Sequence, residues 1–273
     1  MHKFLRAIGF SDITKKDLEM ILDEVITRPE IMKITKDSEG NEFAELSGSF
    51  AANAGITVRG TYQEDDSFHM DYYYPYVFGT SITTNEQIDV EKHAEKESYA
   101  GVCDEVNLGV TLIFYIQNVA DYLAETNRHL SKIHYGAMLA GLSTEGKILC
   151  PVVERKKNDV PAIQKNDRHN QLIAQAREGD EDAIESLTLE DMDTYALLSQ
   201  RVMKEDIFSI VKSTFMPFGI ESDQYTVLGE IIDCVTMENK LTHEKLYGMK
   251  LLCNNIQFDV CINEKDLLGE PAI

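Results

Sequence analysis

The sequence contains no tryptophan, six prolines and only five cysteines among its 273 residues. The cysteine count is odd, and no two cysteines are closer than eight positions. This spacing excludes a CxxC zinc or redox pair and argues against a disulfide framework. We therefore expect no metal site and no cofactor at the cysteines, and a reducing, cytoplasmic location.

Positive charge is also scarce. There are 26 lysines and arginines against 47 aspartates and glutamates, which gives a net charge of -21. Because binding to nucleic acid or to anionic lipid depends on clustered cations, we expect neither kind of partner. No run approaches the ~20 apolar residues of a membrane helix. The N-terminus lacks the continuous apolar segment of a secretory signal. The sequence thus predicts a soluble protein with no membrane partner.

Hydrophobic residues make up 43% of the chain, which is enough for a real core. The clearest local pattern is GVTLIFYIQNVADYLAE at residues 109–125. Residues 110–116 are apolar at every position but Thr111, which predicts a strand covered on both faces. Asn118 is expected to cap a helix that follows directly. Near the N-terminus, Thr14 is expected to cap another helix that ends before Pro29.

Period-2 alternation predicts an antiparallel meander of three strands between residues 42 and 76. Facing the inward residues toward each other sets a register in which Phe50 opposes Ile56 and Tyr62 opposes Phe68. The same register places Arg59 opposite Asp71 on the outer face. The predicted inward residues are Ala44, Leu46, Gly48, Phe50, Ile56, Val58, Gly60, Tyr62, Phe68, Met70, Tyr72, Tyr74 and Tyr76.

The remaining pattern predicts an α+β fold: an antiparallel sheet meander with packed helices, a helical middle section and a small C-terminal β unit. Residues 1–153 form the first domain, in which 80–107 is a long loop with short elements and 133–153 contains a hairpin. Residues 154–170 are a linker. Residues 171–273 comprise helices to about residue 215, followed by a β-rich unit.

Four polar residues of the meander form the most interesting candidate site, namely Arg59, His69, Asp71 and Tyr73. His69, Asp71 and Tyr73 share the outer parity of their strand, so they should lie about 7 Å apart along it. The predicted register brings Arg59 alongside Asp71. A histidine oriented by a carboxylate is the beginning of general acid–base machinery. The same alternation also predicts a solvated polar sheet face, which is the commoner explanation.

Near-matches to known motifs fail at a required position. Residues 141–147 resemble a phosphate-binding loop, but Ile148 stands where Ser or Thr must hold magnesium. His243 begins like a zinc-protease helix, but Tyr247 replaces the second histidine. Cys103 is the cysteine we expect to be most exposed, and its acidic neighbours should raise its pKa and disfavour a thiolate.

Three segments resemble an uncharacterised bacterial protein family of similar length, namely HKFLRAIGF (2–10), EDIFSIVKSTFMPFG (205–219) and FDVCINEKDLLGEP (258–271). The resemblance implies a cytoplasmic bacterial protein and assigns no residue a role. It also implies that relatives continue past the GEP segment. We therefore expect a trimmed chain, in which the predicted strand 256–262 has an open edge or pairs it with a second molecule.

The sequence thus favours a cytoplasmic, non-enzymatic binding, scaffold or regulatory protein. Its partner would be an unknown protein or small molecule, with a homo-oligomer as a further option. The alternative is a hydrolase-like enzyme that uses carboxylates and a histidine dispersed in the sequence.

Overall fold

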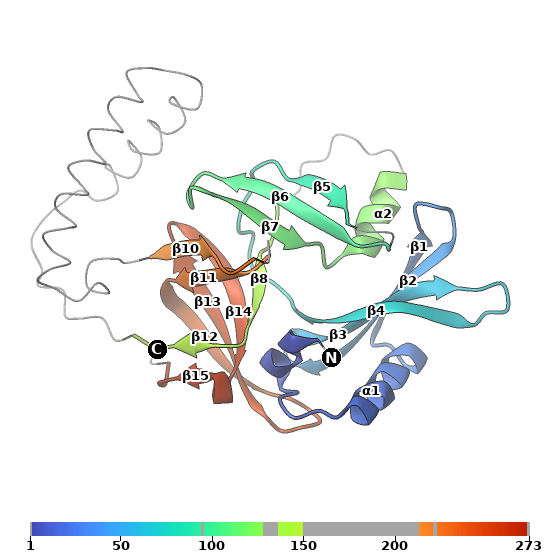
Figure 1. Ribbon diagram of the computed structural model, residues 1–273, viewed down its shortest axis with the longest axis horizontal. Coiled ribbons are helices and arrows are strands. Elements are labelled where there is room, and N and C mark those ends of the chain that lie inside the picture. The colour runs from blue at the N-terminus through green and yellow to red at the C-terminus, as the bar shows by residue number, and fades with distance from the viewer. Residues whose placement is uncertain (1, 94–95, 128–135, 150–212, 221–222, 272–273) are drawn as a thin grey trace, which may run out of the picture.

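The computed structural model describes residues 2–93, 96–127, 136–149, 213–220 and 223–271. Several small β-sheets and a few helices build the described part of the chain (Figure 1). The elements in chain order are η1 (Lys3–Ile8), α1 (Lys15–Thr27), β1 (Ile31–Lys36), β2 (Glu42–Ala51), β3 (Ala54–Tyr62), β4 (Phe68–Val77), β5 (Asp89–Lys92), β6 (Tyr99–Glu105), β7 (Val110–Tyr115), α2 (Val119–Asn127), β8 (Ala140–Ser143), β9 (Gly146–Lys147), β10 (Thr214–Pro217), β11 (Tyr225–Leu228), β12 (Glu230–Glu238), β13 (Lys245–Cys253), β14 (Ile256–Asn263), η3 (Glu264–Asp266) and β15 (Leu267–Leu268).

The predicted meander is present as β2, β3 and β4, and β1 adds a fourth antiparallel strand that alternation did not indicate. We call these four strands the N-terminal sheet. Tyr62 opposes Phe68 as predicted. The predicted pairing of Phe50 with Ile56 is wrong, because Ile56 opposes Gly48. The register also shifts by one residue next to the turn between β2 and β3, where Ala51 opposes Ala54.

A β-bulge in β4 changes which side chains share a face. Arg59 opposes Tyr72, whereas the next residue of β3, Gly60, opposes Met70. Asp71 therefore has no residue opposite it in β3. An extra residue in one strand inverts the alternation beyond it. Tyr72 therefore lies on the face opposite to Met70, and so do Tyr74 and Tyr76, which the unbroken alternation assigned to the inward set.

One face of the N-terminal sheet packs against α1. Thr14 caps this helix by accepting a hydrogen bond from the Asp17 amide at 3.2 Å, as predicted. Its buried residues join one core with Leu46, Phe50 and Val58 of the sheet, and the predicted burial of these three residues is confirmed. The helix contributes Leu18, Ile21, Leu22 and Val25 to that core.

The opposite face packs against α2, where Phe43 of β2 joins Val119, Ala120 and Leu123 of the helix in a second core (Figure 1). The sheet is therefore covered on both faces near its middle. The outer residues that alternation assigned to solvent are buried for this reason. They are Glu45, Ser47, Thr57 and Arg59.

The strand and helix predicted within 109–125 are present as β7 and α2. The expectation that this strand is covered on both faces is wrong, since only Leu112 of β7 is fully buried. β7 belongs to a three-stranded sheet, β5-β6-β7, which we call the middle sheet. Two of its strands, β5 and β6, lie in the segment predicted to be mainly a loop.

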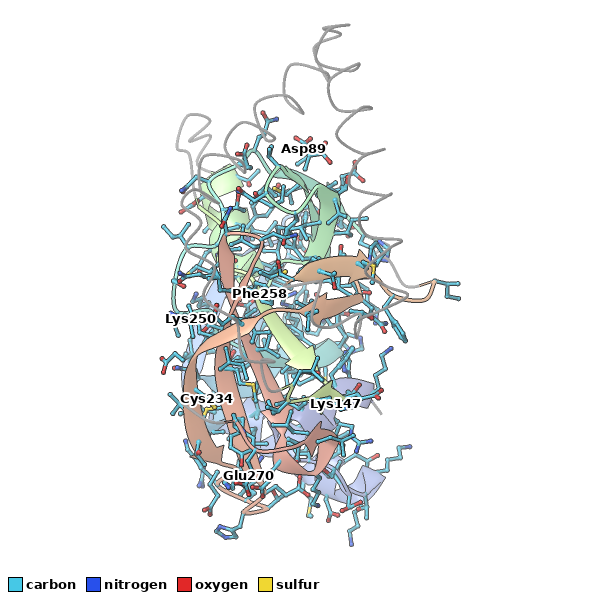
Figure 2. All side chains as sticks on the ribbon, turned by 90° about the vertical axis from the view of Figure 1, so that its left-hand side faces the viewer. Asp89, Lys147, Cys234, Lys250, Phe258 and Glu270 are labelled. Carbon is cyan, nitrogen blue, oxygen red and sulfur yellow. The ribbon has the colours of Figure 1, made fainter. Side chains whose placement is uncertain are left out.

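The C-terminal sheet has the order β12-β13-β14-β8. Figure 2 labels Cys234 on β12, Lys250 on β13 and Phe258 on β14. The expected open edge at 256–262 is wrong, because β14 pairs with β13 on one side and with β8 on the other. Asn254 and Asn255 form the turn between β13 and β14, and both residues have a positive φ.

Two further predictions need correction. In the described part of the predicted hairpin, residues 136–149, β8 and β9 do not pair with each other, because β8 pairs with β14 whereas β9 pairs with β15. The helix predicted to reach residue 215 does not extend that far, because β10 begins at Thr214. The linker at 154–170 and the helices predicted from 171 onward lie outside the described residues. The division into domains stays a prediction, although β8 and β14 join its two parts.

Candidate functional site

The structure does not assemble the four polar residues predicted as a site. Arg59 is only 3% exposed on the α2 face of the N-terminal sheet. His69 is exposed near the β3–β4 turn, and Asp71 occupies the bulge. Tyr73 lies on the other face and packs against the α1 core. The bulge is the cause, because it places His69 and Tyr73 on opposite faces although they are four positions apart.

Arg59 is instead the centre of a buried network. Its Nε donates to Glu45 Oε2 at 2.9 Å. Its two terminal nitrogens donate to the hydroxyls of Tyr72 at 2.8 Å and Tyr74 at 2.7 Å, and the guanidinium lies over the Tyr74 ring. Burial raises the pKa of Glu45, although the attraction of Arg59 opposes this shift.

The same arginine connects the N-terminal sheet to the turn between β7 and α2. Arg59 Nη2 donates to the carbonyl oxygens of Gln117 at 2.9 Å and Ile116 at 3.2 Å. The Tyr74 hydroxyl also donates to the Gln117 carbonyl at 2.9 Å. A planar guanidinium with five donors suits such a junction. These contacts assign Arg59 a structural role in holding α2 on the sheet.

A small cavity lies beside this network on the α2 face, with a volume of about 70 Å³. Two charged residues line it, and each has a partner. Lys33 donates to Asp121 at 2.6 Å, and Glu45 accepts from Arg59. The cavity is lined by Ile31, Lys33, Glu45, Ser47, Thr57, Tyr74, Tyr76, Phe78, Gln117 and Asn118.

The α1 face ends in exposed apolar side chains. Met32 is 49% exposed, Ile34 is 46% exposed and Met70 is 39% exposed. Residues opposite each other in antiparallel strands point to the same face. The register runs from Ile34 through Ala44 and Gly60 to Met70, so one apolar row crosses all four strands.

Two aromatic residues extend this row. Tyr62 and Phe68 oppose each other in the next row, are half-buried, and have ring centroids 5.3 Å apart. We call Met32, Ile34, Tyr62, Phe68 and Met70 the apolar end of the N-terminal sheet. Past α1, the strands carrying it extend toward the right of Figure 1. Tyr62 and Phe68 pack against the α1 core, in line with their predicted inward position, whereas Met70 was also predicted inward and is exposed.

Acidic side chains surround the apolar end. Five exposed carboxylates lie at this end of the sheet. Four are in the β1–β2 and β3–β4 turns, and the fifth, Glu42, is at the start of β2. Three lysines lie in the same region: Lys36 donates to the Gly40 carbonyl, Lys92 to the Ser38 hydroxyl and Lys96 to the Asp71 carbonyl. The exposed acidic residues are Glu39, Glu42, Glu64, Asp65 and Asp66.

The reactive residues considered from the sequence are held in structural positions. Cys103 is buried, so its expected exposure is wrong. Its pKa is raised to about 11 by burial and then by Glu105, Glu86 and Asp104, in the direction the sequence predicted. His243 lies in a turn with a positive φ and contacts Glu238.

Among the described residues, no group of three or more potential ligands could hold a metal ion. In the same part of the chain, no helix has the length and hydropathy to cross a membrane.

Two of the segments that carry the resemblance contact each other. The buried Asn263 in FDVCINEKDLLGEP donates to the Arg6 carbonyl in HKFLRAIGF at 3.1 Å. Cys261 Sγ lies 3.3 Å from the Ala7 carbonyl, and Arg6 pairs with Asp266. These residues therefore fix η1 on the C-terminal sheet, which is a structural role.

Residues 5–273 match a family model described as "Domain of unknown function, E. rectale Gene description (DUF3881)". No curated protein and no solved structure matches the chain.

Proposed function

We propose a role in partner binding for this chain, which belongs to the family of unknown function that its model match defines over residues 5–273. The protein docks a partner protein on the apolar end of the N-terminal sheet. The observation that carries this proposal is the exposure of Met32, Ile34 and Met70 on one sheet face. The odd, well-separated cysteines support action in the cytoplasm.

A contiguous apolar surface rimmed by polar groups is a common mark of a protein contact site. Here Ile34 and Met70 are the exposed apolar ends of one row, and Met32 is exposed on the same face. Ala44 and Gly60, which lie between Ile34 and Met70, are buried, so a partner would contact the side chains at the two ends of the row.

Charge selects the kind of partner. The exposed carboxylates around the apolar end, together with the net charge of -21, attract a partner with lysines or arginines around its apolar residues. A second copy of this chain would bring the same carboxylates into contact, and like charges oppose such a pairing. We therefore propose a basic partner in preference to a homo-oligomer.

The hydrolase-like alternative is less well supported by the geometry. His69, Asp71 and Tyr73 do not share a face, and Arg59 is occupied by the β7–α2 turn. The buried thiols of Cys103, Cys253 and Cys261 have raised pKa values, which disfavour a thiolate nucleophile. A binding role makes use of the exposed apolar surface, whereas these groups do not provide a catalytic set.

The proposal can be tested with a short synthetic peptide of alternating leucine and lysine, labelled for fluorescence anisotropy. The double variant Ile34→Ser with Met70→Ser keeps the net charge of the full chain. We expect it to bind about tenfold more weakly, because two apolar anchors are lost. The matched control is Ile232→Ser with Val235→Ser, which changes two exposed apolar residues of β12 and should bind as the wild type does.

Salt and self-association complete the test. Binding should weaken as salt rises from about 50 to 200 mM, because the rim contacts are exposed. Equal affinities for wild type and both double variants would mean attraction to net charge alone, and would overturn the proposal. Sedimentation of a dimer that dissociates in the Ile34→Ser and Met70→Ser variant would assign the surface to a second copy instead.

A further inference from the structure

Apolar and polar side chains together line the cavity on the α2 face of the N-terminal sheet. Three of its polar residues, Glu45, Ser47 and Thr57, are each more than nine-tenths buried. The Ser47 and Thr57 hydroxyls lie 2.8 Å apart, and Tyr74 and Tyr76 also line the cavity. A cavity of about 70 Å³ that contains polar groups is large enough to hold water or a small polar group.

We propose that this cavity is a binding site for a small neutral ligand with a hydrogen-bonding head group, of the class of short aliphatic primary amides. The site lies on the face opposite to the apolar end, so this inference does not depend on the proposed docking function.

The charges around the cavity select a neutral head group. Lys33 is paired with Asp121, and Glu45 is paired with Arg59. Each pair is neutral overall, so neither would compensate the charge of an ionic ligand in the cavity. Burying such an unpaired ion is costly. A neutral amide meets hydroxyl and carboxylate acceptors on one wall, and the side chains of Gln117 and Asn118 on the other.

The size of the cavity sets the size of the head group. An apolar cavity of about 150 Å³ holds benzene, which has six carbon atoms. A cavity of about 70 Å³ therefore accepts about three non-hydrogen atoms, the number in a primary amide group. Ile31 and Phe78 are partly exposed lining residues, so they provide an apolar rim for a short aliphatic tail.

The test compares three probes of equal chain length on the full chain, namely butyramide, butyrate and butylammonium. Binding is followed by NMR chemical-shift titration. We expect butyramide to saturate with a dissociation constant on the order of 1 mM, the range for such small ligands. The two ions should bind at least about tenfold more weakly, because each would leave a charge unpaired in the cavity.

Variants locate the site. Thr57→Val replaces a lining hydroxyl by a methyl group of similar size, and should weaken butyramide binding about tenfold. Thr61→Val is the matched control on the same strand and face but outside the cavity, and should bind as the wild type does. If Thr57→Val fails to fold, Asn118→Leu changes an exposed lining residue and serves the same purpose.

Three results would overturn the proposal. The first is no saturable shift with butyramide, which would mean that the cavity holds only water. The second is tighter binding of butyrate or butylammonium than of butyramide. The third is a dissociation constant unchanged by both Thr57→Val and Asn118→Leu. Saturable butyramide binding that is lost in Thr57→Val and kept in Thr61→Val would support it.

Discussion

On the α2 face of the N-terminal sheet, Arg59 and Glu45 are buried and paired. On the α1 face of the same sheet, Ile34 and Met70 are exposed although they are apolar. Charged residues are usually exposed and large apolar residues are usually buried, so both observations are exceptions. The difference indicates that the two faces have different roles. The polar face is closed by α2 and fixes the middle sheet in place, whereas the other face ends in exposed apolar side chains on which we propose that a partner docks.

The energetics of the two faces should differ in the same way. A buried ion pair with several hydrogen bonds makes a structure specific, and breaking it leaves a charge without compensation. Exposed apolar side chains contribute little to folding but much to association once a partner covers them. Substitutions on the α2 face should therefore change stability, and substitutions at the apolar end should change binding.

The largest expected effect is on the α2 face. Arg59→Ala should lower the free energy of unfolding by about 3–5 kcal/mol, because it leaves Glu45 buried without its partner and removes the donors to Ile116 and Gln117. Urea denaturation measures this loss. The double variant Arg59→Met with Glu45→Met should be less destabilised than Arg59→Ala, since no unpaired charge remains. A loss below about 1 kcal/mol in Arg59→Ala would show that Arg59 does not hold α2 on the N-terminal sheet.

A second effect contrasts two residues in the same row of the α1 face. Leu46 is fully buried and lies directly opposite Met32, which is exposed. Leu46→Ala should cost about 2–5 kcal/mol, whereas Met32→Ala should cost less than about 0.5 kcal/mol. Thermal unfolding of both variants in the same buffer measures the gap. Similar costs would mean that the apolar end is part of the core, contrary to the proposed docking surface.

A smaller effect depends on pH and concerns Glu97, which joins the β1–β2 turn to the middle sheet. Burial would raise the pKa of Glu97, but hydrogen bonds from Lys92, Ser38 and Tyr99 outweigh it and lower the pKa below its usual 4.5. Glu97→Gln should therefore cost about 1–3 kcal/mol at neutral pH.

The sign of this pH dependence follows from linkage. The lowered native pKa means that the stabilisation by Glu97 is fully present above pH 4.5 and is lost as the pH falls through the native value. The stability difference between wild type and Glu97→Gln should accordingly shrink in acid. A difference that is constant from neutral pH to acid would contradict the assigned contacts.

Local patterns predicted the elements whose signals are local. The Thr14 cap and the helix that follows it were predicted correctly, and so were the three meander strands. These features depend on a few neighbouring residues. The position of β8 beside β14 was beyond such reasoning, because a parallel pairing over more than one hundred residues leaves no local mark.

The candidate site shows even more clearly that local patterns do not predict long-range contacts. The candidate set aligned Arg59 with His69, Asp71 and Tyr73 on the assumption of unbroken alternation. One extra residue at Asp71 reversed the faces of the tyrosines that follow it. Alternation also cannot tell that α2 covers the outer face, because that depends on a helix more than fifty residues away. The exposed apolar end was missed for the complementary reason, since apolar residues were assumed to be covered.

The most direct test of the two-face account is hydrogen–deuterium exchange of the full chain with and without the leucine–lysine peptide. The account predicts slower exchange in β1 and in the first half of β4, with no change in α2. It also predicts that, at the same peptide concentration, Ile34→Ser with Met70→Ser reduces the protection while leaving the exchange of the free protein as in the wild type. Protection confined to α2 or to the C-terminal sheet would contradict the account.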